Sequence, residues 1–300
     1  MKSEDLEKYN SIRAGNIGFI EQKRGLIEVS GKEAVQFLNG LLTNDVAKLA
    51  ENEQMWAAFP NAQGRLLAVV RGLHREAKFF FETEKTTHEK VFQNLFRFTF
   101  AGDFFVNDLS ENYRYYEIPN AHFVSQNSDS IIFKSLVGTS HFVKGAVDEE
   151  FRKALRKAGA IEISPELYET VRIEQGIPLY GVDMDETTIV PELGIDGLIS
   201  YNKGCYIGQE IIARIHFRGH IAKQLTGLVF EDENVSVKPS DEIKTADGKN
   251  AGKITSATYS PKLQKTIALG YVRYDYLAEG TELKIGDLTA TVKNLPFIEN

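Results

Sequence analysis

The chain has 300 residues, more than one hydrophobic core usually organises, so we expect two or three structural units. Hydrophobic residues make up 42% and charged residues 26% of it, as in an ordinary globular protein. The formal net charge of -7 argues against a general nucleic-acid or membrane-surface binder, because such proteins are usually basic.

A single cysteine, Cys205, excludes an intrachain disulfide. The first residues, MKSEDLEKYNSIRAGNIGF, are too acidic for a transit peptide and lack the apolar core of a signal peptide. No apolar run approaches the roughly 20 residues that span a bilayer. We therefore predict a cytoplasmic protein with no direct contact with nucleic acid and none with a membrane.

The first third of the chain predicts mixed strands and helices. GLIEVS (25–30) is typical of a strand, and Ser30 with Glu33 then forms a capping-box pattern that predicts a helix start. The apolar runs 55–59 and 65–70 flank PNAQG, which predicts a hairpin.

The next stretch continues this mixture. We expect a strand at 78–83 and an amphipathic helix at 88–98, followed by short strands at 113–118, 130–137 and 141–145.

Two helices are predicted in the middle of the chain, over 149–160 and over SPELYETVRIEQG (164–176). The second has Ser164 as its N-cap, Pro165 at its first position and Gly176 at its end. From about residue 223, short strands alternate with Gly, Asp-Gly and Ser-Pro turns, which predicts a small barrel or sandwich. The expected domains are therefore residues 1–222 and 223–300.

Cys205 lies within YNKGCYIGQEIIARIHFRGH (201–220). The isoleucines after it indicate a helix that begins just beyond the cysteine, where the helix dipole and Lys203 would favour the reactive thiolate. The alternative is a buried small hydrophobe. Residue chemistry alone leaves both open.

The same stretch contains two histidines and a basic group. Cys205, His216 and His220 have spacings that resemble a zinc pattern, but Gly219 interrupts the helix that would align the histidines and the sequence offers no fourth ligand. The basic group could attract an anionic ligand or form an ordinary solvated helix face. It comprises Lys203, Arg214, His216, Arg218 and His220.

Two further polar stretches have competing interpretations. The acidic group Asp183, Asp185 and Glu186 could bind a metal or protonate a substrate nitrogen, or could be the polar loop after a helix. In FLNGLLTNDVAKL (37–49), Asn44 and Asp45 could recognise the edge of a heterocycle, or could form an Asx-type cap.

Together these stretches resemble one family. KGCYIGQE (203–210) is similar to the K-G-C-Y-x-G-Q-E signature of the folate-binding iron–sulfur cluster maintenance proteins, the YgfZ family. FLNGLLTND and GRLLAVVRG (64–72) resemble its N-terminal motif. RIEQGIPLYGVDMDE (172–186) resembles a segment that the family shares with the glycine-cleavage aminomethyltransferase. The resemblance covers nearly the whole chain, with 100–160 matching poorly.

This resemblance implies an α+β fold, with an aminomethyltransferase-like folate-binding body of two intertwined subdomains and a small C-terminal β-barrel. It implies tetrahydrofolate as cofactor and iron–sulfur client or assembly proteins as partners, including radical enzymes that modify tRNA. Cys205 would be the reactive residue. The implied folate contacts are Asn44, Asp45, Arg172, Glu174, Lys203, Tyr206 and Gln209.

One departure bears on the reaction. The aminomethyltransferase branch uses an aspartate for one-carbon transfer, and the corresponding stretch here, FFFETEKTTHEKVF (79–92), contains none. A misplaced carboxylate would not reach the reacting nitrogen. Cluster maintenance is therefore the leading hypothesis, and a folate-dependent one-carbon transferase or demethylase is the first alternative. The second alternative is a folate-binding module with only a scaffolding role.

Overall fold

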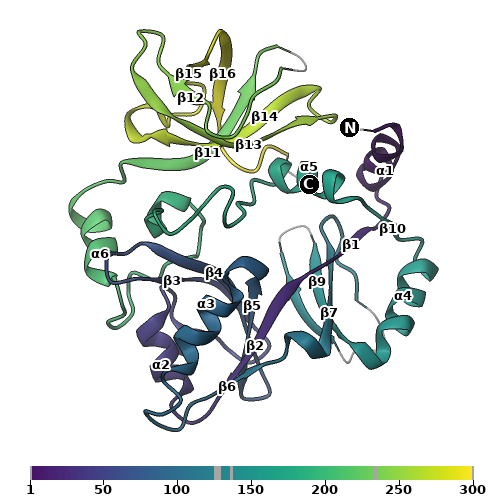
Figure 1. Ribbon diagram of the computed structural model, residues 1–300, viewed down its shortest axis with the longest axis vertical. Helices are drawn as coiled ribbons and strands as arrows, with labels where there is room; N and C mark the ends of the chain where they lie inside the picture. Colours follow the sequence, from purple (N-terminus) through teal and green to yellow (C-terminus); the bar gives the residue numbers. More distant parts are fainter. Residues whose placement is uncertain (1, 125–129, 136–137, 233–234, 299–300) are drawn as a thin grey trace. The chain divides into compact units, whose positions relative to one another are not determined.

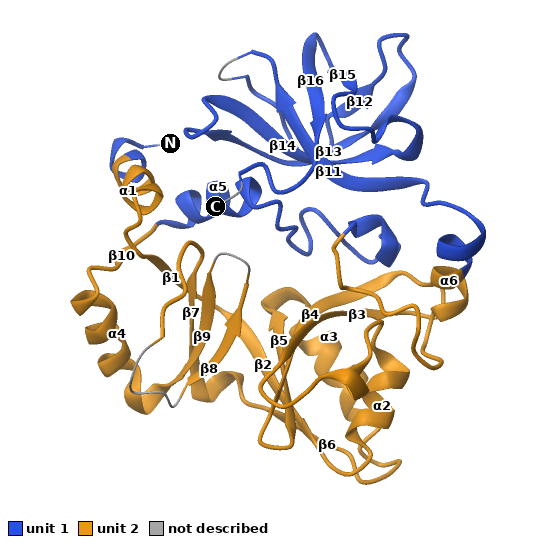
Figure 2. Cartoon of the chain, turned by 180° about the vertical axis from the view of Figure 1, so that it is seen from behind, with its two compact units in different colours: residues 1–6, 164–194, 214–300 blue, residues 7–163, 195–213 orange. Residues whose placement is uncertain are grey.

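The structure is a computed structural model that describes residues 2–124, 130–135, 138–232 and 235–298. Its chain divides into two compact units (Figure 2). Unit 1 comprises Met1–Leu6, Ser164–Gly194 and Arg214–Asn300, whereas unit 2 comprises Glu7–Ile163 and Ile195–Ala213. Each unit is described separately below.

Unit 2 contains two five-stranded sheets with the orders β10-β1-β7-β9-β8 and β3-β4-β5-β2-β6 (Figure 1). The first is formed by β1 (Gly18–Gln22), β7 (Tyr113–Ile118), β8 (Ser130–Lys134), β9 (Thr139–Lys144) and β10 (Ile161–Glu162). The second is formed by β2 (Arg24–Ser30), β3 (Gln54–Pro60), β4 (Leu66–Arg75), β5 (Lys78–Glu84) and β6 (Phe105–Asp108). Because the consecutive strands β1 and β2 enter different sheets, the two halves of the unit are intertwined.

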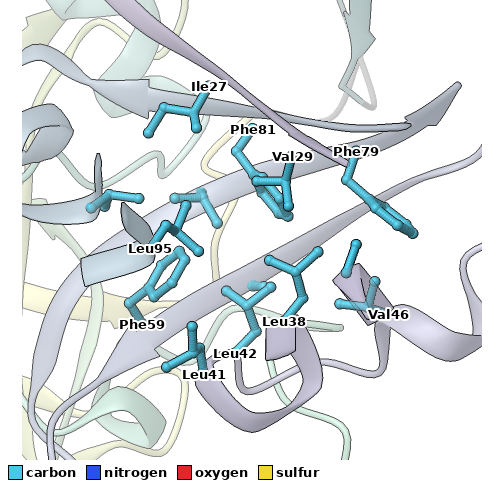
Figure 3. Close-up of a cluster of buried hydrophobic side chains, with 14 of the residues drawn as sticks. Ile27, Val29, Leu38, Leu41, Leu42, Val46, Phe59, Phe79, Phe81 and Leu95 are labelled. Atoms are coloured by element: carbon cyan, nitrogen blue, oxygen red, sulfur yellow. The ribbon is translucent and has the colours of Figure 1, made fainter. Parts of the chain in front are cut away.

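The core of the second sheet lies between its strands and the helices α2 (Ala34–Leu41) and α3 (Lys85–Phe96) (Figure 3). Leu38 of α2 and Leu95 of α3 are fully buried against strand residues such as Phe59 and Phe81. Burial of each such side chain contributes about 1.5–3 kcal/mol, so this core holds both helices on the sheet.

Several predicted elements of unit 2 are confirmed. β3 and β4 form the expected antiparallel hairpin, and β5, β7 and β9 lie where strands were predicted. The helix predicted at 149–160 is α4 (Asp148–Lys157). The strand expected at 130–137 is observed as Ser130–Lys134, and residues 136–137 lie outside the described part of the chain.

The capping box predicted at Ser30 is wrong. Ser30 is the last residue of β2, and α2 begins at Ala34 with no side-chain hydrogen bond at its cap. The carboxylate of Glu33 instead accepts a hydrogen bond from the backbone N–H of Asp103 at 2.6 Å. Glu33 therefore bonds to Asp103, 70 residues away, instead of completing a capping box with Ser30.

Unit 1 contains a closed six-stranded barrel with the order β11-β14-β13-β12-β15-β16, which confirms the small barrel predicted from the strand spacing. Its strands are β11 (Lys223–Phe230), β12 (Glu242–Lys244), β13 (Asn250–Ser260), β14 (Lys265–Arg273), β15 (Glu282–Ile285) and β16 (Leu288–Lys293). The barrel begins at the predicted position, and the compact unit also includes residues from the middle of the chain.

Helix α5 (Pro165–Glu174) of unit 1 follows the sequence prediction closely. The Ser164 hydroxyl accepts a hydrogen bond from the backbone N–H of Leu167 at 3.0 Å, and Gly176 has a φ of 69° just beyond the helix. The Thr170 hydroxyl lies 3.0 Å from that of Thr258, which joins α5 to β13. Helices α1 (Ser3–Arg13) and α6 (Gln209–Arg218) each have residues in both units.

Candidate functional site

The polar break after α2 attaches the segment 195–203 to the sheet of unit 2. The Thr43 hydroxyl donates to the Leu198 carbonyl at 2.7 Å and accepts from the Ala58 N–H at 2.9 Å. The Asn44 side-chain nitrogen donates to the carbonyls of Trp56 at 2.8 Å and Gly197 at 2.7 Å. Both amide hydrogens of Asn44 are therefore used by the fold.

Asp45 caps the short 3₁₀ turn Val46–Lys48, as the Asx-type interpretation predicted. Its carboxylate accepts from the Ala47 N–H at 3.2 Å and from the Asn39 side chain at 3.2 Å, and lies 3.2 Å from Lys48. Burial raises the pKa of Asp45, but the hydrogen bonds from Lys48, Asn39 and Ala47 outweigh it and hold this pKa below its usual range.

Lys203 binds the backbone of the same polar break. Its ammonium donates to the carbonyls of Leu42 at 2.8 Å and Asn44 at 2.6 Å. Burial lowers the pKa of Lys203 to about 8, although the charge of Asp45 opposes this. The ammonium also lies 5.1 Å from the centroid of the Tyr206 ring. The structure thus brings together Asn44, Asp45, Lys203 and Tyr206, which are up to 162 residues apart in the sequence (206 minus 44).

The loop that carries Cys205 is fixed on its other side as well. The backbone N–H of Ile207 donates to the Gly40 carbonyl at 3.1 Å. Gly208 has a φ of +80°, and a Cβ atom there would lie 2.3 Å from the Asn61 carbonyl oxygen, so only glycine fits. Cys205 itself is exposed, which excludes the buried alternative.

The start of α6 differs from the prediction. The helix begins at Gln209, four residues after Cys205, instead of just beyond it. Cys205 therefore precedes the first turn, because the intervening residues Tyr206, Ile207 and Gly208 form the turn that packs on Gly40 and Asn61.

Two predicted folate contacts in this loop keep unused polar groups. Within the described part of the chain, the Tyr206 hydroxyl and the Gln209 side-chain amide make no hydrogen bond. Burial raises the pKa of Tyr206 to about 12, so its hydroxyl remains a neutral donor at physiological pH. Lys203 has a third N–H beyond the two that the carbonyls accept.

Arg172 and Glu174, the other predicted folate contacts, lie on α5 of unit 1. The Arg172 side chain is 1% exposed, and each of its three nitrogens donates to a protein acceptor. Nε donates to Glu169 at 2.8 Å, Nη1 to Asp183 at 2.8 Å and Nη2 to Glu169. This geometry gives Arg172 a structural role and speaks against a ligand contact through its guanidinium.

Asp183 and Glu174 are buried in the same unit. Asp183 accepts from Arg172 and from the hydroxyls of Thr255 at 2.5 Å and Ser256 at 2.7 Å. Glu174 is fully buried and accepts from the Ser260 hydroxyl at 2.5 Å. These bonds join α5 and the loop after it to strand β13, so we assign Glu174 a structural role too.

The acidic group and the histidines show no metal geometry. Asp185 accepts from the Thr187 backbone at 2.8 Å and from its hydroxyl at 2.6 Å, as in the polar-loop interpretation. These hydrogen bonds lower the pKa of Asp185, against burial, which raises it. Across the described residues, no three His, Cys, Asp or Glu side chains gather in a way that could hold a metal ion.

None of the described helices is long and apolar enough to cross a membrane.

A buried ionic network in unit 2 was not predicted from the sequence. Arg71 of β4 donates to the Ser140 hydroxyl at 2.7 Å and to the Glu82 carboxylate. The Tyr115 hydroxyl donates to Glu82 at 2.9 Å, and burial raises the pKa of Tyr115 well above its ordinary value. The signal in the sequence was a lone arginine after the apolar run LLAVV, next to a strand that contains Glu82.

Comparison with known proteins agrees with this architecture. Residues 223–298 match the glycine cleavage T-protein C-terminal barrel domain. A crystal structure of glycine cleavage system aminomethyltransferase T from Bartonella henselae superposes with a TM-score of 0.87 at 19% identity, covering 98% of this chain and 90% of that one. The chain therefore has the aminomethyltransferase-like α+β fold with a C-terminal six-stranded barrel.

The relatives that match include proteins named as aminomethyltransferases and one named as an iron–sulfur cluster assembly factor. An aminomethyltransferase of Bdellovibrio bacteriovorus is 24% identical over 97% of this chain and 90% of its own length. A mitochondrial iron–sulfur cluster assembly factor, the IBA57 homolog of Mycosarcoma maydis, is also 24% identical, over 79% of this chain and 70% of its own length. These matches support a relationship to the glycine-cleavage T-protein superfamily.

Proposed function

We propose that the chain binds tetrahydrofolate and supports the assembly or repair of iron–sulfur clusters, with Cys205 as the reactive residue. The observation that carries the proposal is the Cys205 loop. Its thiol is exposed, while Lys203 and Ile207 on either side are anchored to backbone carbonyls of unit 2. A thiol held in this way has a defined position toward a partner without being enclosed by its own protein.

The unused polar groups of the same loop fit a folate. The third N–H of Lys203, the Tyr206 hydroxyl and the Gln209 amide offer mainly donors, which suit the carbonyl of a pterin or the carboxylate of its glutamate tail. Asn44 and Asp45 support these groups, since the Asn44 carbonyl holds Lys203 and the charge of Asp45 stabilises its ammonium. A bound folate supplies one-carbon or redox chemistry of its own, whereas the residues named here bind and orient it.

One relative supports the partners that we propose. One curated relative is named as an iron–sulfur cluster assembly factor, and we extend that role to this chain. Its clients would be cytoplasmic iron–sulfur proteins, including radical enzymes that modify tRNA. The cluster would be the cargo of the reaction, and Cys205 the group that meets it.

The folate part is tested by calorimetric titration of reduced tetrahydrofolate under anaerobic conditions. Tyr206→Phe removes only one hydroxyl and should weaken binding about 3- to 10-fold, the scale of one hydrogen bond. Tyr276→Phe is the matched control, because Tyr276 packs against the barrel core of unit 1 and does not belong to the loop, and it should bind as the parent protein does. Equal affinity of the parent and Tyr206→Phe would remove Tyr206 from the site.

The cluster part is tested by complementation of a bacterial strain that lacks its own folate-binding cluster maintenance protein. Cys205→Ser should abolish growth under iron-limited or oxidative conditions, yet retain the melting temperature and folate affinity of the parent protein. A Cys205→Ser variant that complements fully would contradict the proposal.

A second candidate function is folate-dependent one-carbon transfer, because several relatives are named aminomethyltransferases. The 79–92 stretch offers little for it. Glu82 is buried and bonded to Tyr115 and Arg71, and Glu89 accepts a surface hydrogen bond from Gln93. Turnover of an aminomethylated carrier with tetrahydrofolate, retained in Cys205→Ser, would favour this alternative.

A further inference from the structure

A basic and aromatic surface lies on unit 1, at the end of α6 and the end of strand β14. We call it the basic aromatic surface and define it by six exposed residues: Arg214, Phe217, Arg218, His220, Arg273 and Tyr274. Phe217 is 65% exposed and Tyr274 49%, values that are high for large hydrophobic side chains. Exposed aromatic rings on the same surface as basic side chains are typical of an interaction site.

The two arginines of α6 are four residues apart and therefore lie on one side of the helix. Within the described part of the chain, neither of them forms an ion pair. Like charges at this spacing destabilise a helix by about 0.2–0.5 kcal/mol. Some exposed lysines of unit 1 do have acidic partners, for example Lys249 with Asp247 at 2.7 Å and Lys293 with Glu279 at 2.7 Å.

The two parts of the surface are joined by ring packing. The His220 and Tyr274 ring centroids are 4.4 Å apart, and Tyr274 directly follows Arg273 at the end of β14. The Arg273 side chain donates one hydrogen bond to the Asn250 carbonyl at 3.4 Å, which holds its position. The arginine charges are thus presented beside aromatic rings on a supported backbone.

A helix dipole alone does not explain this arrangement. Cations in the last turn of a helix are favourable, which accounts for Arg218. It does not account for Arg214, which lies a full turn earlier, or for the exposure of Phe217 and Tyr274. On a chain with a net charge of -7, acidic residues are abundant, yet none of those that the structure describes forms an ion pair with Arg214 or Arg218.

We propose that the basic aromatic surface docks an acidic segment of a partner protein. Within the proposed function, on which this inference rests, that partner is the protein that donates or receives the cluster. Arginine binds carboxylates in a bidentate manner, and exposed aromatic and arginine side chains are the usual anchors of protein interfaces. Three arginines suit a short group of carboxylates better than a nucleic acid, whose binding draws on many more phosphate contacts and would oppose the net charge.

The test uses the full chain and a fluorescent peptide of twelve residues, built from Glu and Asp with two Phe. Anisotropy titration at 50 mM and 200 mM salt should give saturable binding that weakens at least 5-fold at the higher salt. Arg214→Glu/Arg218→Glu should weaken binding at least 10-fold, and Phe217→Ala about 3-fold. Arg214→Gln/Arg218→Gln repeats the test without charge reversal should the first variant fold poorly.

The matched control is Lys244→Glu/Lys249→Glu, which reverses two exposed lysines of the barrel that are paired with Glu242 and Asp247. It should bind the peptide within 2-fold of the parent chain. Cys205→Ser should bind equally well, so that failure of docking and failure of the cluster function are separate results. Absence of binding at 50 mM salt, undiminished binding by the arginine variants, or tighter binding of a single-stranded twelve-nucleotide DNA would each overturn the proposal.

Discussion

The two polar clusters predicted from the sequence differ in how far solvent reaches them. In unit 1, Arg172 and Asp183 are at most 1% exposed. They form an ion pair with each other and hydrogen bonds with neighbouring side chains. In unit 2, Lys203 is partly buried, and the loop beyond it carries an exposed cysteine and polar groups that make no hydrogen bond among the residues the structure describes. We call the Arg172 and Asp183 group the closed cluster, because its polar atoms are bonded within the fold. We call Lys203 and the loop beyond it the open cluster, because it keeps donors that a ligand could use.

The two segments were both predicted to contact folate, but their cationic side chains differ in how many hydrogen-bond donors the fold uses. Burying a guanidinium costs several kcal/mol of desolvation unless its donors all form hydrogen bonds. In unit 1, Asp183 of the same sequence segment accepts from Arg172 and so helps to meet this requirement. The Lys203 ammonium needs only two carbonyls to hold the loop, so a third donor remains. The satisfaction of each polar atom therefore separates structural residues from candidate ligand contacts better than membership of a motif does.

The largest expected effect is in the closed cluster. Asp183→Ala leaves Arg172 with a single acidic partner and removes the carboxylate that accepts from the Ser256 hydroxyl, while the Thr255 hydroxyl keeps only the Leu269 carbonyl. We therefore expect a loss of about 3–5 kcal/mol in the free energy of unfolding. Urea denaturation followed by circular dichroism measures it. Asp247→Ala, which removes an exposed ion pair, is the control and should leave the midpoint unchanged. A fully stable Asp183→Ala would show that the cluster contributes no stability.

The next effect contrasts two glycines on either side of Cys205. Gly208→Ala places a Cβ atom 2.3 Å from the Asn61 carbonyl and forces a φ of +80° on alanine. We expect about 2–4 kcal/mol of destabilisation, or displacement of the loop. Gly204→Ala meets no atom within 4 Å and should cost less than about 1 kcal/mol. Equal stability of the two variants would mean that the loop is not held against the hairpin.

The local structure of the chain could be predicted well from the sequence, for a physical reason. The cap of α5 depends on Ser164 and Leu167, three residues apart, and the barrel strands depend on alternation and turn residues. Where a partner is distant, the same reasoning failed. Glu33 accepts from Asp103 instead of completing a cap with Ser30, because a loop 70 residues away supplies a nearer donor.

The candidate site was predictable only in part. The resemblance placed Asn44 and Asp45 with Lys203, and the structure brings them together through bonds that span about 160 residues. The sequence around Arg172 does not predict that its side chain is buried, because this burial depends on Asp183 and on strand β13. The exposure of Cys205 likewise follows from the position of its loop, which packing sets.

The smallest expected effect concerns the open cluster and depends on pH. Burial lowers the pKa of Lys203 from 10.5 to about 8, so the unfolded chain binds this proton more tightly than the folded one. The unfolding free energy contributed by Lys203 should therefore rise with pH from about 8 toward 10.5, as the buried charge is relieved. Below pH 8 the charged form carries its full desolvation cost.

Lys203→Met isolates this effect, because the variant keeps most of the side-chain volume and has no titrating group. The difference in unfolding free energy between the parent chain and Lys203→Met should shift in favour of the parent between pH 7 and pH 9.5, measured by urea denaturation at each pH. At pH 7 the two hydrogen bonds to Leu42 and Asn44 oppose the desolvation cost, so the net change should be modest, on the order of 1–2 kcal/mol. A difference in unfolding free energy that stays constant with pH would show that the Lys203 ammonium is solvated. It would also contradict the proposal that Lys203 holds a fixed donor toward a ligand.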